Sequence, residues 1–250
     1  MTRTTVTPIA WRLATISAIR DETPSVRTFT LAPPDWPGHR AGQHVDLRLT
    51  AEDGYSVERS YSIASEPERH GEIDLTVERI EGGEVSAFLH EGVVVGDRIE
   101  VRGPIGGYFV WDAQLDGPLL LVAGGSGVVP LMSMLRHRAV ARPTSAARLL
   151  FSSREQDEII YREELDRLAG RRDGFEVAYT LTRIQPPDWT GYRRRIDDRM
   201  LADVIEPLGT TARAYICGPT ALVETAANAL VRLDLPVDRI RTERFGPTGT

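Results

Sequence analysis

The pattern of hydrophobic residues changes between Trp111 and Gly117, and this change restricts the fold of the 250-residue chain more than any other feature. Before it, short segments of alternating apolar and polar residues follow one another, separated by turn residues. A period of two is typical of half-buried strands, and such a series favours an antiparallel β-barrel. We expect one helix over 83–92 and strands over 13–23, 25–32, 44–50, 58–65, 72–80 and 97–104.

After the change, continuous apolar runs alternate with helical segments. The alternation predicts a doubly wound parallel α/β domain, in which ligands bind at the carboxyl ends of the strands. We expect strands over 119–124, 147–153, 175–182 and 213–218, and helices over 128–140, 159–170, 200–207 and 220–235. The chain therefore divides into an antiparallel β-barrel domain, 1–113, and a doubly wound α/β domain, 114–250.

Charge and cysteine content argue against several classes of protein. The net charge of −6 disfavours nucleic acid as a partner. No apolar run approaches the roughly 20 residues of a transmembrane helix, and the N-terminus lacks a signal-peptide core, so we expect a cytoplasmic protein without a membrane partner. The single cysteine, Cys217, excludes an intrachain disulfide and a cluster held by four thiolates of this sequence. The five histidines are scattered, so we expect no metal site.

Residues 59–65, RSYSIAS, combine an arginine, a tyrosine and three serines in one expected strand. The alternation places Tyr61 and Ile63 on one face and Ser60 and Ser62 on the other. These side chains suit a flat, negatively charged ligand, although the plainest interpretation is a half-buried strand.

A glycine-rich turn, Gly124-Gly125-Ser126-Gly127, follows the strand at 119–124 and precedes a helix that starts near Pro130. Glycines let a backbone approach a phosphate, and the N–H groups at a helix start attract anions. Proline suits the first helical turn, where its missing N–H costs nothing. The spacing differs from the usual dinucleotide fingerprint. The alternative interpretation is a plain strand-to-helix turn.

Strand ends elsewhere in this domain carry cations. The strand 147–153 ends at Ser153 and continues into Arg154, where NAD-preferring folds commonly place an acid that holds the ribose hydroxyls. An arginine there favours the 2′-phosphate of NADPH, although Glu155 follows it directly. Arg183 is a second candidate cation. Alternatively, both arginines lie in solvated loops.

Cys217 ends another expected strand and is followed by Gly218 and Pro219. This position faces a nicotinamide cleft, or the cysteine is a small packing residue. Near the C-terminus, Glu243 and Phe245 form an acid–aromatic pair. The pair closes over a planar ring, or it belongs to a solvent-exposed tail.

Together and in this order, RxYS, a glycine turn with a serine on a short helix, GGxGxxP, CGP and the terminal acid and aromatic resemble the ferredoxin–NADP reductase superfamily. The similarity covers residues 10–247 and is greatest to FAD-binding oxidoreductases that act as reductase components of oxygenases. It implies a flavin-binding barrel, an NAD(P)-binding α/β domain, and a reductase that passes electrons from NADPH through FAD. FMN and NADH are the alternative cofactors.

The resemblance also implies residue roles. Ser62 would lie near flavin N5, Cys217 beside the nicotinamide, and Glu243 would position or relay a proton. Arg59 would pair with the flavin phosphate, and Tyr61 would lie on the ring. Further flavin contacts would come from Ser60, Val77, Arg79, Gly83, Glu84, Val85, Ser86 and Phe245. Nucleotide contacts would come from Gly125, Ser126, Gly127, Val128, Ser153, Arg154, Arg183, Cys217, Gly218 and Pro219.

The expected electron acceptor is a separate protein, because the sequence has no cysteines for the iron–sulfur domain that many oxygenase reductases carry. A ferredoxin or an oxygenase would take this role. The alternatives are a small acceptor (free flavin, ferric chelate or quinone) and an electron-shuttling subunit of a larger complex. A basic surface near the flavin favours a protein acceptor, because ferredoxins are acidic. Arg193-Arg194-Arg195 is that surface, a part of the nucleotide-binding site, or a solvated loop, and we expect a monomer.

Overall fold

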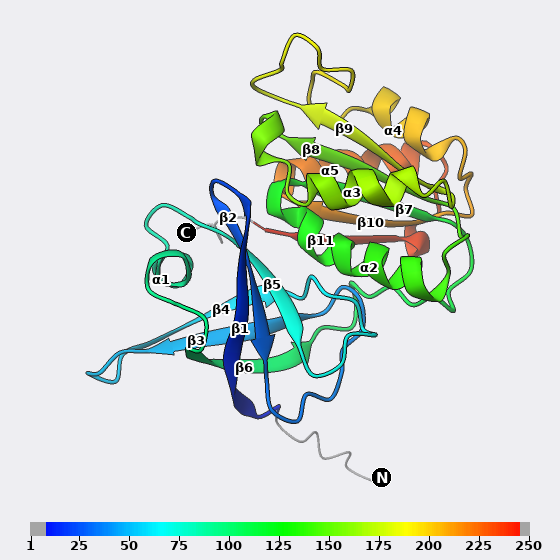
Figure 1. Ribbon diagram of the computed structural model, residues 1–250. Coiled ribbons are helices and arrows are strands. Elements are labelled where there is room, and N and C mark those ends of the chain that lie inside the picture. Colours follow the sequence, from blue (N-terminus) through cyan, green and yellow to red (C-terminus); the bar gives the residue numbers. More distant parts are fainter. Residues whose placement is uncertain (1–8, 246–250) are drawn as a thin grey trace.

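The computed structural model describes residues 9–245, which form two lobes, each built on one β-sheet (Figure 1). The first sheet is antiparallel, with the strand order β4-β3-β6-β1-β2-β5. Its strands are β1 (Trp11–Thr23), β2 (Val26–Ala32), β3 (His44–Thr50), β4 (Ser56–Ser62), β5 (Ile73–Glu78) and β6 (Arg98–Ile105).

The two edges of this sheet approach each other, which makes it barrel-like. Ile63, directly after β4, forms an isolated antiparallel bridge with Leu75 of β5. Helix α1 (Glu84–Glu91) packs beside these two strands and contributes Val85 and Leu89 to the core of the barrel. The barrel-like antiparallel domain expected from the period-two pattern is therefore confirmed.

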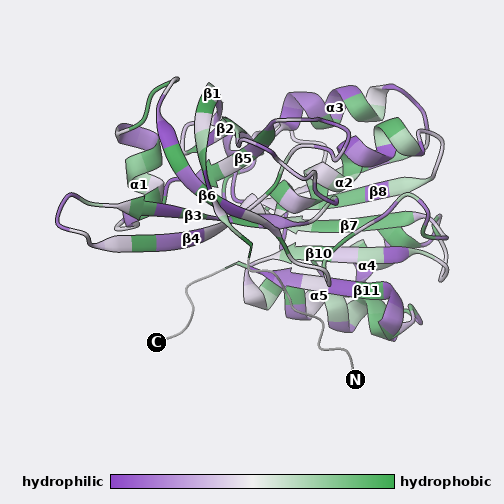
Figure 2. Cartoon of the chain, turned by 90° about the horizontal axis from the view of Figure 1, so that it is seen from below, coloured by the Kyte–Doolittle hydropathy of each residue, from purple (hydrophilic) through white to green (hydrophobic). Residues whose placement is uncertain are grey.

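The second sheet is parallel and has the order β11-β10-β7-β8-β9. Its strands are β7 (Leu119–Gly124), β8 (Ala147–Ser153), β9 (Phe175–Leu181), β10 (Arg213–Gly218) and β11 (Ile240–Arg244). Helices cover both faces, α2 (Val128–Ala141) and α3 (Arg162–Gly170) on one, α4 (Asp198–Ile205) and α5 (Thr220–Arg232) on the other (Figures 1 and 2). Because both faces are covered, every residue of the central strand β7 is buried, and its apolar run is continuous. This confirms the doubly wound domain.

Two helix starts differ from the expected ones for local reasons. The helix expected over 159–170 begins at Arg162, because Tyr161 adopts the left-handed conformation with φ of 59°. The helix expected over 200–207 begins two residues earlier. There Asp197 caps it by accepting a hydrogen bond of 2.8 Å from a backbone N–H of the first turn.

Strand β11 is not evident from the sequence. Four of its five residues, IRTER, are polar, and it lies at the edge of the sheet with most of its side chains only half-buried. This segment is a strand because it pairs in parallel with β10, and not because it has a hydrophobic pattern.

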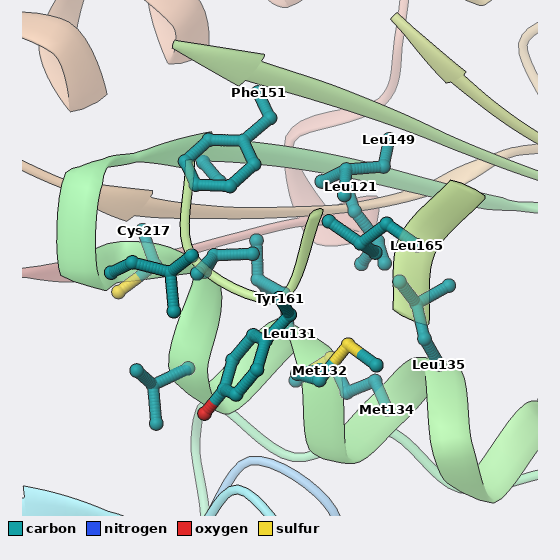
Figure 3. Close-up of a cluster of buried hydrophobic side chains, with 14 of the residues drawn as sticks. Leu121, Leu131, Met132, Met134, Leu135, Leu149, Phe151, Tyr161, Leu165 and Cys217 are labelled. Carbon is teal, nitrogen blue, oxygen red and sulfur yellow. The ribbon is translucent and has the colours of Figure 1, made fainter. Parts of the chain in front are cut away.

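Side-chain contacts hold the second domain against the barrel. The Ser133 hydroxyl of α2 donates to the carbonyl oxygen of Ser65 at 2.6 Å. The hydroxyl of Tyr161, which points away from Leu121, Leu149 and Leu165 in Figure 3, donates to the Thr76 hydroxyl of β5. Strand β5 also lies against the turn Gly125–Gly127. The carboxyl edge of the parallel sheet therefore adjoins the barrel.

Within residues 9–245, no helix is both long and apolar enough to cross a bilayer. The same part of the chain contains no group of three or more histidine, cysteine or acidic side chains that is arranged to hold a metal ion.

Candidate active site

The site is centred where the strand order of the parallel sheet reverses, between β7 and β10. The chain continues from β7 to β8 and β9 on one side, and from β10 to β11 on the other. Connections that leave in opposite directions open a crevice at the carboxyl ends of the strands. The turns that border this crevice carry the GGSG and CGP sequences.

Glycines allow these two turns to pack closely. A Cβ on Gly127 would lie 2.1 Å from the carbonyl oxygen of Cys217, and one on Gly124 would lie 2.9 Å from Cδ of Pro219. Gly125 has φ of +54° and faces open space. Two local features therefore explain why glycine occupies these positions: close packing at Gly124 and Gly127, and a left-handed turn at Gly125.

The turn Gly125–Gly127 is a short 3₁₀ helix that leads into α2 at Val128, where the helix expected over 128–140 begins, so Pro130 lies in the first turn. The Val128 N–H bonds back to the carbonyls of Gly125 and Ser126, and no side chain within residues 9–245 caps this end. The remaining N–H groups of the turn therefore form the anion-attracting end of the helix.

Cys217 and Glu243 are directly paired in the register of β10 and β11. Cys217 is completely buried, and Oε2 of Glu243 is buried without a hydrogen-bond partner among the described residues. Burial raises the pKa of Glu243 to about 7. Burial and the neighbouring Glu243 also raise the pKa of the Cys217 thiol well above its usual value. The carboxyl group can therefore exchange a proton near neutral pH, whereas the cysteine remains a thiol.

Glu243 and Phe245 do not lie in a solvent-exposed tail, so that alternative is wrong. Glu243 belongs to β11, and the N–H of Phe245 donates to the carbonyl of Gly218 at 3.0 Å. The half-buried Phe245 ring packs against the core that contains Cys217.

In β4, Arg59 and Tyr61 share one face of the strand. The Arg59 guanidinium is exposed, donates to the carbonyl oxygen of Glu58 at 2.8 Å, and forms no ion pair within residues 9–245. Burial raises the pKa of Tyr61 to about 12, so its hydroxyl stays neutral. An uncompensated cation and an uncharged aromatic ring therefore stand next to each other.

Ser60 and Ser62 lie on the opposite face. The Ser60 hydroxyl donates to the Asp46 carboxylate at 2.6 Å, so a barrel residue occupies it. Ser62 is only 6% exposed and pairs in register with His44, whose pKa is lowered by burial. The only sequence signal at His44 is its place after Gly42 and Gln43 at the start of a strand, and this does not indicate a position beside Ser62.

The N-terminus of α1 is held by its own turn. Gly83 is the residue before the helix, and the Ser86 hydroxyl donates to the carbonyl of Gly83 at 3.3 Å while accepting from the Ile80 N–H at 3.1 Å. The Glu84 carboxylate accepts from the Tyr55 hydroxyl at 3.1 Å. The backbone N–H groups of the first turn are therefore what this helix end offers an anion.

The side chains of three neighbouring candidates make contacts within the barrel domain. The side chains of Val77 and Val85 are buried in the barrel core. The Arg79 guanidinium pairs with Glu91. Any ligand contact by these residues would therefore be made by main-chain atoms.

Ser153, Arg154 and Arg183 come together at the ends of β8 and β9. The Thr182 N–H donates to Ser153 O at 3.0 Å, and the Arg183 N–H donates to Arg154 O at 2.9 Å. Both arginines are exposed, and neither forms an ion pair within residues 9–245. Two positive charges are thus brought together at the carboxyl ends of β8 and β9.

Arg193-Arg194-Arg195 lies far from Cys217, beyond β9 at the opposite edge from β10 and β11. Arg193 donates to the carbonyl oxygen of Trp189 at 2.6 Å. Arg194 pairs with Asp197 at 2.6 Å. This run is therefore not part of the crevice.

Two family models match the chain. Residues 13–110 match the oxidoreductase FAD-binding domain, and residues 121–228 match the oxidoreductase NAD-binding domain. The first family model covers the antiparallel sheet from β1 to β6, and the second covers β7 to β10.

The chain is also similar to individual proteins over most of its length. The chain is 32% identical to the reductase component DmpP of phenol 2-monooxygenase from Pseudomonas sp. over 92% of its length, which is 64% of that protein. It is 34% identical to the glycine betaine monooxygenase reductase subunit of Pseudomonas aeruginosa, covering 91% of this chain and 62% of that one. The cytochrome P450 reductase GcoB of Amycolatopsis superimposes with a TM-score of 0.84 at 27% identity, covering 98% of this chain and 72% of that one. The chain therefore spans less than two thirds of the length of the phenol and glycine betaine monooxygenase reductase proteins.

Proposed function

The chain belongs to the ferredoxin–NADP reductase superfamily, with an FAD-binding and an NAD-binding oxidoreductase domain, and from this premise we propose that it is an NADPH-dependent flavoprotein reductase that delivers electrons to a separate protein. One observation carries the proposal. The half-buried Glu243 has one buried carboxyl oxygen without a hydrogen-bond partner among residues 9–245, and it stands beside the Cys217 thiol, where the parallel sheet adjoins the barrel.

Residues 1–113 would bind FAD and residues 114–250 the nucleotide. The exposed Arg59 supplies a planar guanidinium for a flavin phosphate, and Tyr61 supplies a flat ring. The first turn of α1 supplies N–H donors for the rest of the pyrophosphate. The further flavin contacts would be backbone contacts of Ser60, Val77 and Arg79, the Ser62 hydroxyl and the Phe245 ring.

The nucleotide would lie across the crevice, with its pyrophosphate at the turn Gly125–Val128. Arg154 and Arg183 would neutralise a 2′-phosphate, which favours NADPH over NADH. Cys217, Gly218 and Pro219 would border the nicotinamide. The CGP turn packs closely against the glycine-rich turn, so no bulky side chain would separate the nicotinamide from the backbone there.

When bound, FAD accepts a hydride from a reduced nicotinamide and releases the electrons singly. The chain contributes placement and charge. Glu243, with a pKa of about 7, holds or releases a proton at the crevice. The neutral Cys217 thiol fills the floor of the crevice without adding a charge.

A protein acceptor is supported by the relatives, whose names describe reductase components or subunits of monooxygenases. The test is an anaerobic visible spectrum of the FAD-loaded protein, titrated separately with NADPH and NADH. We expect bleaching of the flavin band that is faster with NADPH. A protein that cannot be loaded with FAD or FMN, or whose flavin neither nucleotide bleaches, would refute the proposed function. Faster bleaching by NADH would refute only the assignment of Arg154 and Arg183.

A further inference from the structure

The segment that continues from the end of β6 toward the second domain lies beside the RSYSIAS motif. It runs from Gly103 in β6 to Tyr108, and its last three residues, Gly106–Tyr108, are exposed. Tyr108 is 61% exposed, so most of its side chain faces solvent.

Three arginines from separate parts of the chain converge on this segment. Arg12 of β1 donates to the carbonyl oxygen of Gly103 at 3.3 Å. The Arg40 guanidinium lies 3.8 Å from the position of a Cβ on Gly107. The Arg241 guanidinium of β11 lies 5.0 Å from the centre of the Tyr108 ring.

These three charges are not compensated locally. None of the three arginines forms an ion pair with a carboxylate in the part of the chain that the structure describes, although many other arginines do. A chain with a net charge of −6 therefore carries a local positive surface around an exposed tyrosine. Arginine and tyrosine are the residue types that concentrate binding energy in protein interfaces.

The same segment adjoins the end of the RSYSIAS motif. The Gln43 side chain donates to the carbonyl oxygen of Gly106 at 2.7 Å. The next residue, His44, pairs with Ser62 on one side and with Ile105 on the other. Only one strand thus separates Ser62 from the connecting segment.

We propose that Arg12, Arg40, Tyr108 and Arg241, which we call the connector surface, dock an acidic one-electron carrier protein. The inference rests on the proposed reductase function and adds that its partner protein is negatively charged. It replaces Arg193-Arg194-Arg195, which lies at the far edge of the sheet, as the basic surface of the molecule. The overall reaction is that one NADPH and two oxidised carriers give NADP⁺, one proton and two reduced carriers.

The test uses the FAD-loaded protein, NADPH, and an acidic plant-type [2Fe–2S] ferredoxin as the probe. The double variant R40E/R241E reverses two charges of the connector surface, and R195E makes the same kind of change at the far edge. Reduction of 1,4-benzoquinone, a small uncharged acceptor, measures electron flow that needs no docking. Absorbance of bound flavin and far-UV circular dichroism check that the variants are folded.

We expect the kcat/KM for ferredoxin at low salt to fall by about tenfold or more in R40E/R241E, and by less than twofold in R195E. The rate with benzoquinone should stay unchanged, and the difference for ferredoxin should shrink as salt is raised. An unchanged ferredoxin rate in the double variant, or an equal loss in R195E, would overturn the proposal. So would a wild-type protein that reduces benzoquinone but not ferredoxin. Failure to reduce benzoquinone as well would instead refute the reductase function.

Discussion

The Glu243 carboxyl should make the stability of the protein depend on pH. Its pKa is about 7 in the folded protein, against 4.5 for an unperturbed carboxyl. The folded state therefore binds more protons than the unfolded state between these two values. The contribution of Glu243 to stability consequently falls as pH rises through this window, and above it the buried carboxylate is destabilising.

The substitution Glu243→Gln removes this effect because the amide does not ionise. A pKa difference of about 2.5 corresponds to about 3 kcal/mol at pH 8 and to about 1 kcal/mol at pH 5, where the native carboxyl is still protonated. E243Q should therefore gain about 2 kcal/mol relative to wild type between pH 5 and pH 8.

The assay is urea unfolding of the FAD-saturated wild type and E243Q at both pH values, with the slope of the transition checked for equality. The matched control is E206Q, which removes one negative charge from an exposed position at the end of α4. A difference between wild type and E243Q that is the same at pH 5 and pH 8 would show that Glu243 is not a carboxyl with a raised pKa. An equal pH-dependent gain in E206Q would attribute the effect to overall charge.

Three further predictions follow from the site. Arg59→Gln should weaken FAD binding by about 10- to 100-fold, because a charge-assisted hydrogen bond to phosphate is lost, and the affinity of Arg59→Lys should lie between those of wild type and Arg59→Gln. Flavin fluorescence on dilution measures the affinity, and equal affinity in all three proteins would contradict the prediction. The substitutions Arg154→Ala and Arg183→Ala should each raise the KM for NADPH by about tenfold and leave the KM for NADH unchanged. An equal rise in the KM for both nucleotides would argue against 2′-phosphate recognition. Gly127→Ala should destabilise the protein by about 3 kcal/mol, because its Cβ would collide with the Cys217 carbonyl, whereas a Cβ at Gly170 would have nothing within 4 Å and Gly170→Ala should not destabilise it. Thermal melting compares the two variants, and equal melting temperatures would show that the turn shifts to accommodate the added Cβ.

Much of the site was predictable because its parts are local. RSYSIAS, GGSG and CGP each lie within one strand end and the turn after it, where the order of residues sets both backbone shape and side-chain direction. The position of Arg183 beside Arg154 was less certain, because it depends on the pairing of β8 with β9.

Other features depend on neighbours that are remote in sequence. His44 gains its place beside Ser62 only through the pairing of β3 with β4. Whether a serine hydroxyl is free to bind a ligand also depends on such neighbours. The Ser60 hydroxyl already bonds to Asp46, and the Ser86 hydroxyl already bonds within its own turn. A pattern of residue types does not show which hydrogen bonds are already made.

The sequence by itself determined the two-domain architecture, because the hydrophobic period reflects how many faces of each strand are buried. It also determined the family, through short motifs in a fixed order. Only the tertiary structure decided that residues 240–244 form a strand and that one carboxyl oxygen of Glu243 is buried beside Cys217. The physical reason is that a polar edge strand has no hydrophobic signature of its own, so its conformation, and the raised pKa that follows from burial, come from the strand on which it pairs.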